Sequence, residues 1–161
     1  MTPQRDEHPW HEAVAIPVLL RHARRAYGSA MRTALAAIGC DDVPRNGLYV
    51  IGGMAKGAGG VPLSQLVREL GVSKQAAGQL VDTLVVRGYL DRSADAEDRR
   101  KISITLTPRG QAAAAAQAAA RDRVDAELAA RAGPDCVAAM RKALGTLCDM
   151  GQQDAAGDHQ P

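Results

Sequence analysis

Residues 63–110 decide the fold, and they run LSQLVRELGVSKQAAGQLVDTLVVRGYLDRSADAEDRRKISITLTPRG. The segment LSQLVREL places its apolar side chains on one face of a helix, and Gly71 is a typical helix stop. Ser73 is a good N-cap for a second helix that runs to Arg87 and ends at Gly88. Two short helices joined by a turn that contains glycine predict a helix-turn-helix.

A β-hairpin is predicted directly after the second helix. Beyond Gly88 the apolar period changes from about 3.6 residues to about 2, so residues 89–93 and 102–106 alternate as strands do. The charged stretch 94–101 connects them as a long tip. We therefore expect the helix-turn-helix to carry a two-stranded wing.

A long amphipathic helix is expected before this segment. Pro17 suits its first turn, and Gly39 marks its end. Its apolar face comprises Leu20, Ala23, Tyr27, Ala30, Met31, Leu35 and Ile38, and its other face carries Arg21, Arg24, Arg25 and Arg32. A short helix over 47–56 follows it, although the flexibility of Gly52 and Gly53 weakens that prediction.

Two further helices are expected after the hairpin. Thr107 as N-cap and Pro108 at the first helical position begin an alanine-rich helix, which Gly133-Pro134 ends. The last helix has an apolar stripe formed by Val137, Met140, Leu144 and Leu147. The polar residues after Met150 are interpreted as a disordered tail.

Composition points to a mainly α protein. The chain has 161 residues, a length that suits one domain, and only 2% of its residues are aromatic although 46% are hydrophobic. A core built from aliphatic helix faces fits this balance better than an aromatic-rich β-sandwich. The net charge of +2 is too small to indicate nucleic-acid binding by itself, so clustering of cations has to decide that question.

Several classes of protein are disfavoured. Three cysteines without a CxxC spacing argue against a secreted disulfide scaffold, and the N-terminus resembles no signal peptide. No apolar run is long enough to cross a bilayer, so we expect a cytoplasmic protein without membrane association. No nucleophile elbow, phosphate loop or dinucleotide fingerprint occurs, so an enzyme is not expected, and neither is a cofactor.

The second helix of the helix-turn-helix has the side chains that base recognition requires. Gln75 and Gln79 lie one turn apart, and glutamine can form a bidentate pair with adenine. Ser73 and Lys74 suit phosphate contacts at a helix N-terminus. The small residues Ala77 and Gly78 permit close approach to a groove. Taken alone, these polar residues fit a solvated helix face better than a DNA contact.

The predicted wing tip adds a cluster of cations. Arg99, Arg100 and Lys101 follow one another directly after Asp98. An arginine at the end of a two-stranded arm can enter a minor groove, and a neighbouring carboxylate can orient its guanidinium. A solvated turn would account for the acidic residues but less readily for three consecutive cations. The wing therefore favours the DNA-binding interpretation of the preceding helix.

Residues 63–110 resemble the winged helix-turn-helix of the MarR (multiple antibiotic resistance regulator) family. The wing signature of that family is matched by Asp98, Arg100, Leu106 and Thr107, while Ala96 stands where proline is common. The resemblance implies a homodimeric, cytoplasmic transcription regulator, more often a repressor, that binds a pseudo-palindromic operator in double-stranded DNA. It also implies that the N- and C-terminal helices form the dimer interface. The composition supports dimerisation independently. With so few aromatic residues, the apolar stripes of these helices have little to pack against within one subunit.

On this interpretation the chain divides into five segments. They are a flexible arm (1–12), an N-terminal dimerisation helix (13–40), the winged helix-turn-helix (44–110), the C-terminal dimerisation helices (111–150) and a disordered tail (151–161). Two alternatives remain open. One is a winged-helix module that binds proteins, and the other is an architectural DNA-binding protein without a ligand response.

Sites for small ligands are less well indicated. The resemblance implies a phenolic or anionic effector, for which the candidates are Arg21, His22, Arg25, Tyr27 and Tyr49. From the sequence, these residues fit an ordinary surface with half-buried tyrosines better than an effector site.

Thiol sensing and metal binding have weaker support still. For oxidant sensing Cys136, near the start of the last helix, is a better candidate than Cys40, although inert cysteines are the common case. His8 and His11 lack companion ligands, so no metal is expected.

Overall fold

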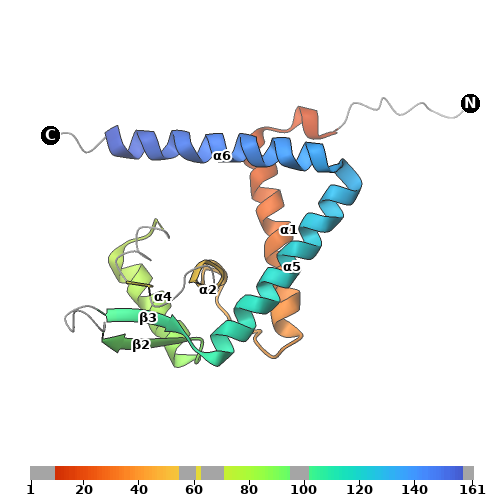
Figure 1. Cartoon of the computed structure of the whole chain (residues 1–161). Coiled ribbons are helices and arrows are strands. Elements are labelled where there is room, and N and C mark those ends of the chain that lie inside the picture. The colour runs from red at the N-terminus through yellow and green to blue at the C-terminus, as the bar shows by residue number, and fades with distance from the viewer. Residues whose placement is uncertain (1–9, 55–60, 63–70, 95–101, 158–161) are drawn as a thin grey trace, which may run out of the picture. The chain divides into compact units, whose positions relative to one another are not determined.

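The computed structural model describes residues 10–54, 61–62, 71–94 and 102–157 (Figure 1). Its elements in chain order are η1 (Trp10–Ala13), α1 (Ile16–Ala36), α2 (Gly47–Met54), β1 (Val61–Pro62), α4 (Lys74–Val86), β2 (Leu90–Ala94), β3 (Ile102–Leu106), α5 (Pro108–Ala132) and α6 (Pro134–Gly157). The predicted helix over 63–70 and the wing tip over 95–101 lie outside the described residues. The described chain is mainly helical with one small sheet, which confirms the predicted fold class.

The chain divides into two compact units, Met1–Arg121 and Asp122–Pro161. The alanine-rich helix α5 continues without a break from Pro108 to Ala132. Both the division between the units and the predicted domain boundary after residue 110 therefore fall inside this helix. Among the described helices, none combines the length and the apolar character that crossing a bilayer requires.

The sheet has three strands in the order β1-β3-β2. β2 and β3 form the predicted antiparallel hairpin, with Leu90 opposite Leu106 at its base and Ala94 opposite Ile102 at its outer end. β1 adds a third strand, pairing Val61 with Ile104. The sequence did not predict β1, because two residues that include a proline are too short to show a strand period.

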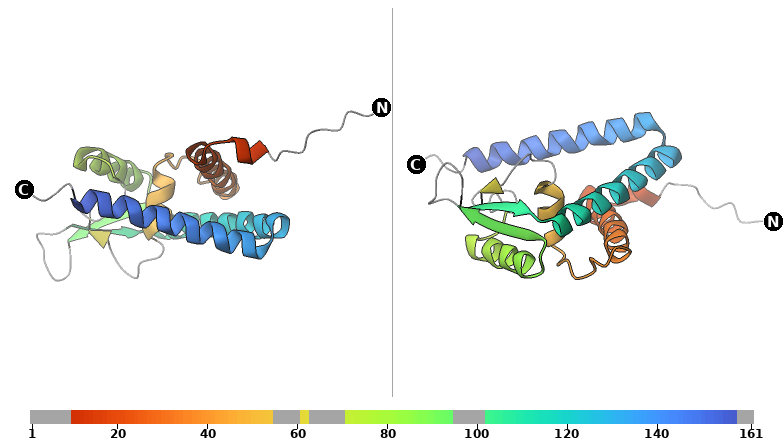
Figure 2. Two further views of the ribbon diagram at one scale, coloured as in Figure 1. Left: turned by 90° about the horizontal axis from the view of Figure 1, so that it is seen from above. Right: turned by 60° about the horizontal axis from the view of Figure 1, so that its bottom comes forward.

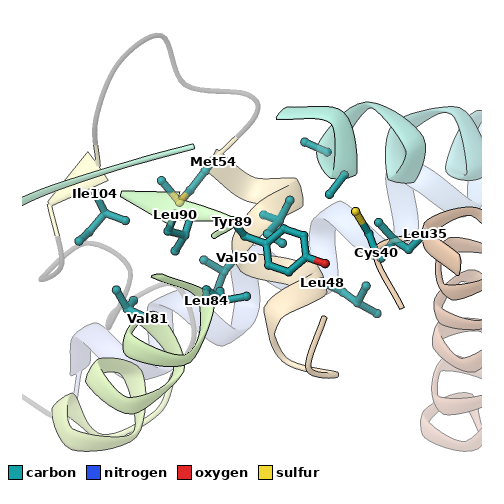
Figure 3. Close-up of a cluster of buried hydrophobic side chains, with 13 residues drawn as sticks. Leu35, Cys40, Leu48, Val50, Met54, Val81, Leu84, Tyr89, Leu90 and Ile104 are labelled. Atoms are coloured by element: carbon teal, nitrogen blue, oxygen red, sulfur yellow. The ribbon is translucent and has the colours of Figure 1, made fainter. Parts of the chain in front are cut away.

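The core of the first unit lies between α2, α4 and the hairpin. α4 turns Val81 and Leu84 inward, as its apolar period predicts, and both are fully buried. Figure 3 shows them with Leu90 and Ile104 of the hairpin and Leu48 and Val50 of α2. Figure 2 shows α4 lying beside the β2–β3 hairpin, so the core fixes the position of the recognition helix relative to the wing strands.

α1 buries less of its predicted apolar face than expected. Gly28, Met31 and Leu35 are buried, whereas Ala23 is exposed and the side chain of Ile38 is 47% exposed. The helix ends at Ala36, and the turn that follows reverses at Gly39 with φ +70°. Ile38 therefore does not continue the helical stripe, which is why its predicted burial is wrong.

Both predicted disordered ends are partly ordered. Residues 10–12 of the predicted arm belong to η1, and α6 continues through the predicted tail to Gly157. The segment 151–157 has no apolar period, but two Gln and two Ala, which are good helix formers, make up part of it. An amphipathic pattern is therefore not required for this segment to be helical, which is why the prediction from the pattern missed it.

The side chains predicted as N-caps make the expected bonds. Ser73 Oγ accepts a hydrogen bond from Ala76 N at 3.2 Å, and Thr107 Oγ1 accepts one from Gly110 N at 3.0 Å. Thr107 Oγ1 also donates to Gly88 O at 2.6 Å, which ties the start of α5 to the end of the recognition helix.

Removal of the α4 cap is expected to destabilise the protein. In Ser73→Ala the Ala76 N–H loses its side-chain acceptor, so the free energy of unfolding should fall by about 1 kcal/mol. Urea denaturation measures the loss. Ser29→Ala, an exposed position within α1, serves as the control and should be neutral or slightly stabilising. Equal stabilities of Ser73→Ala and the wild type would show that the cap contributes nothing.

Candidate nucleic-acid interface

The first two turns of α4 present polar side chains to solvent. Ser73, Lys74, Gln75 and Gln79 are all exposed, as predicted from their positions at the start of the recognition helix. Ser73 Oγ takes up the N–H group of Ala76, and the other N–H groups of the first turn give this end of α4 a positive partial charge beside Lys74. This end of the helix therefore combines a positive partial charge, a cation and two amide side chains.

One predicted contact residue is wrong. Ala77 is fully buried, so it cannot approach a groove. It lies four residues before Val81 and seven before Leu84 on the same helix face, and it packs in the core with them. Gly78 is half-exposed, and a Cβ built there meets no heavy atom within 4 Å, so this position is open as predicted.

An ion pair joins α4 to the wing strand β2. Arg92 Nη2 lies 2.7 Å from Asp82 Oδ1, and both side chains are at least one-third exposed. A pair this accessible contributes little to stability, so the apolar core and not this pair holds the hairpin against α4. The sequence does not indicate this pair, because the two residues lie on different elements and neither belongs to a motif.

A polar cluster around the buried Tyr89, formed with the partly exposed side chains of Asp42 and Arg109, anchors the base of the hairpin to the loop after α1. Tyr89 is fully buried, and its hydroxyl donates to Asp42 Oδ1. Figure 3 shows the Tyr89 ring reaching from the hairpin base toward Cys40. The hydrogen bond from Tyr89, followed by the charge of Arg109, lowers the pKa of Asp42 below its ordinary value. Burial first, and the hydrogen bond to Asp42 second, raise the pKa of Tyr89 above its ordinary value, so the hydroxyl keeps its proton.

Arg109 completes this cluster from the first turn of α5. Its Nη2 lies 3.1 Å from Asp42 Oδ1 and 3.1 Å from the Tyr89 hydroxyl oxygen, and its Cζ lies 4.5 Å from the centre of the Tyr89 ring. Its Nη1 donates to Arg87 O at 3.0 Å. The cluster thus joins the end of α1, the end of α4, the hairpin and α5 around one tyrosine.

The predicted wing contacts Asp98, Arg99, Arg100 and Lys101 lie outside the described residues. The paired strands end at Ala94 and Ile102, so these four residues belong to the connection between them. Their contact with DNA remains a prediction from the sequence.

The predicted effector residues are only partly brought together. Arg21, Arg25 and Tyr49 line a cleft of about 530 Å³ between α1 and the start of α2, whereas His22 and Tyr27 are not among its lining residues. The cleft is also lined by Arg24, Gly28, Arg32, Arg45, Asn46 and Leu48. Arg24 and Arg32 belong to the arginine face predicted for α1, so their place near the cleft could have been inferred from the sequence. Arg45 lies in a loop, and no periodic pattern predicts where a loop runs.

Within the described parts of the chain, Cys40 lies after α1, whereas Cys136 and Cys148 both lie on α6. Cys40 is buried, and Cys136 and Cys148 are exposed. Within the described residues, no group of three or more His, Cys, Asp or Glu side chains is arranged to hold a metal ion. His11 lies exposed in η1, and His8 lies outside the described residues.

Comparisons with known proteins agree with this fold. The sequence model of the MarR family matches residues 41–101, the segment that contains α2, α4 and the first hairpin strand, β2. No curated protein sequence matches the chain. Among solved structures, Streptococcus pneumoniae FabT in complex with DNA is 20% identical with a TM-score of 0.73, covering 86% of this chain and 96% of FabT.

Two further structures show the same likeness. A structure of MarR is 17% identical with a TM-score of 0.70 and covers 98% of this chain and 99% of that one. A probable transcriptional regulator from Pseudomonas aeruginosa is 26% identical with a TM-score of 0.62 and covers 82% of this chain and 96% of its own. The match to the MarR family model over residues 41–101, together with a likeness in fold over most of the chain, shows that this protein has the winged-helix fold of the MarR structures.

Proposed function

We propose that the protein is a transcriptional regulator that binds double-stranded DNA in a sequence-specific manner. The observation that carries the proposal is the exposed start of α4, where Lys74, Gln75 and Gln79 are exposed on a helix whose opposite face packs in the core through Val81 and Leu84. A recognition helix requires this division between a packed face and a polar face. The likeness to FabT, whose structure contains DNA, supports the same function.

The regulator acts as a homodimer on a pseudo-palindromic operator. Within its own unit, residues 122–161, α6 up to Gly151 has no buried residue, although its stripe of Met140, Leu144 and Leu147 is apolar. A second copy is the natural partner for such a stripe, because a two-fold dimer pairs the same surface with itself. Two recognition helices would then reach half-sites about 34–36 Å apart along one face of the duplex.

Regulation is by occlusion of a promoter in the cytoplasm, relieved by a small ligand. A related structure concerns Bordetella bronchiseptica BpsR, whose DNA binding is regulated by 6-hydroxynicotinic acid. In this chain the cleft lined by Arg21, Arg25 and Tyr49 is the place for such a ligand. Because the cleft lies between α1 and α2, a ligand there contacts the helix whose packing supports α4.

Two alternatives make different predictions. A module that binds only proteins would show no preference for any duplex. An architectural protein would bind DNA but show no ligand response. Selection of fragments bound from the source genome, followed by gel shifts of the selected sites against scrambled duplexes, tests the proposal. Enrichment of one palindromic motif supports it, and equal binding of all fragments would contradict it.

Charge removal at the wing is expected to weaken every duplex alike. Arg100→Gln removes a cation that would meet a phosphate or the minor groove, so log affinity against log salt should flatten by about one unit for each phosphate no longer neutralised. Fluorescence anisotropy over a salt series measures the slope. Arg123→Gln, an exposed arginine of α5, is the control and should leave the slope unchanged. An unaltered slope in Arg100→Gln would exclude the wing from the interface.

A further inference from the structure

The cleft between α1 and α2 is unusually rich in arginine. Arg21, Arg25 and Arg32 follow one another at steps that keep them on one face of α1, with Arg24 beside them. Gly28 lies in the middle of this face, is buried, and lines the cleft. The absence of a side chain at Gly28 leaves room between the guanidinium groups.

The opposite wall adds cationic character. Arg45 and Asn46 precede α2, so the N-terminal end of that helix, with its positive partial charge, lies at the cleft. None of the residues that line the cleft is acidic. Arg92, Arg109, Arg131 and Arg141, which form ion pairs with acidic side chains, do not line the cleft.

Tyr49 does not offer a free aromatic platform. Arg24 Nε donates to its hydroxyl oxygen at 2.6 Å, and Arg24 Cζ lies 4.5 Å from the centre of its ring. One face of the ring and the hydroxyl are therefore already occupied by a guanidinium. Leu48 is the remaining large apolar residue in the lining, whereas pockets for aromatic ligands are mostly apolar.

We propose that the cleft binds a small polyanion, a molecule with two or more phosphate or carboxylate groups, rather than an aromatic acid with a single charge. This inference rests on the proposed function, of which the polyanion would be the effector. Five guanidinium groups around a cleft of about 530 Å³ can grip several anionic groups at once through paired N–H donors. A single carboxylate would satisfy one of them and leave the others in mutual repulsion.

The first test uses pyrophosphate and citrate as probes, with benzoate as the singly charged comparison, all at matched ionic strength. Isothermal titration calorimetry should show binding of one or both polyanions and at least about tenfold weaker binding of benzoate. Binding of pyrophosphate alone would assign the site to phosphate groups, and binding of citrate alone would assign it to carboxylates. Benzoate binding equal to that of both polyanions would overturn the proposal.

Two variants separate the cleft from non-specific attraction. The double variant Arg21→Gln/Arg25→Gln removes two charges. The affinity for a polyanion should fall at least about tenfold for each charge removed. The melting temperature of this variant without ligand should stay the same or rise, because like charges are removed, whereas a structural role for these arginines would lower it. Gly28→Leu should block binding without changing any charge, and Arg123→Gln should bind as the wild type does.

Other results of these measurements would overturn either the polyanion site or the proposed function. Equal weakening in Arg123→Gln would show attraction to the whole chain and overturn the proposal. A shift of the double arginine variant from dimer to monomer in sedimentation would assign the cleft to the subunit interface and also overturn it. Operator affinity is measured separately without probe, so a protein that binds its operator but neither polyanion keeps the proposed function and loses this inference. A protein that binds a polyanion but no duplex loses the proposed function instead.

Discussion

Replacement of Gly110 by alanine is expected to cost about 3 kcal/mol or more of unfolding free energy, the largest stability effect of any single methyl group proposed for this chain. A Cβ at this position would overlap the backbone carbonyl oxygen of Tyr89 and lie 3.0 Å from Leu106 Cδ2. The Tyr89 oxygen also accepts a hydrogen bond from Thr107 N at 3.1 Å. The carbonyl therefore cannot move aside without breaking the hydrogen bond that closes the hairpin base.

Urea denaturation of Gly110→Ala and the wild type measures this loss. Gly53→Ala is the matched control, because Gly53 is also helical but exposed, and a Cβ there meets nothing within 4 Å. That substitution should stabilise the protein by up to about 1 kcal/mol through helix propensity alone. A Gly110→Ala protein as stable as the wild type would show that α5 does not approach the hairpin as closely as the structure indicates.

The position of Gly110 also matters for DNA binding. It follows Arg109, whose side chain holds Asp42 and Tyr89, and Thr107, whose hydroxyl holds Gly88. These interactions set where β2 leaves the recognition helix. A variant that loosens them should therefore impair the wing before it impairs α4, which keeps its own apolar packing against α2.

The local elements were predictable from the sequence because they depend on neighbouring residues. The Ser73 cap, the glycine stops and the alternation in the hairpin are all encoded within a few positions. The burial of Ala77 is encoded locally too, since it precedes Val81 and Leu84 at helical steps. Its small size suggested a groove contact, but its place on the helix face decides its burial.

Interactions between distant segments were not predictable in this way. Asp42, Tyr89 and Arg109 meet across separations of 47 and 67 residues, and no motif marks them as partners. The arginine cleft shows both cases. The face of α1 was visible from its period, whereas the approach of Arg45 and the stacking of Arg24 on Tyr49 depend on how the loop before α2 folds back.

The strongest functional effect is expected from the recognition helix. Gln75→Ala/Gln79→Ala removes two exposed amides, and each bidentate pair with adenine contributes about 1–3 kcal/mol of discrimination. Preference for the operator over a scrambled duplex should thus fall by about 10- to 100-fold for each such pair that the substitutions remove. Stability should hardly change, because both residues are exposed and alanine is at least as good a helix former as glutamine.

The salt dependence distinguishes this variant from one altered in the wing. Glutamine carries no charge, so the slope of log affinity against log salt should stay at its wild-type value while specificity is reduced. Arg100→Gln should do the reverse, lowering the slope with a smaller change in preference. Gln111→Ala, an exposed glutamine in the first turns of α5, is the control and should alter neither quantity. If the double variant kept its full preference for the operator, base recognition would have to come from residues other than those exposed on α4.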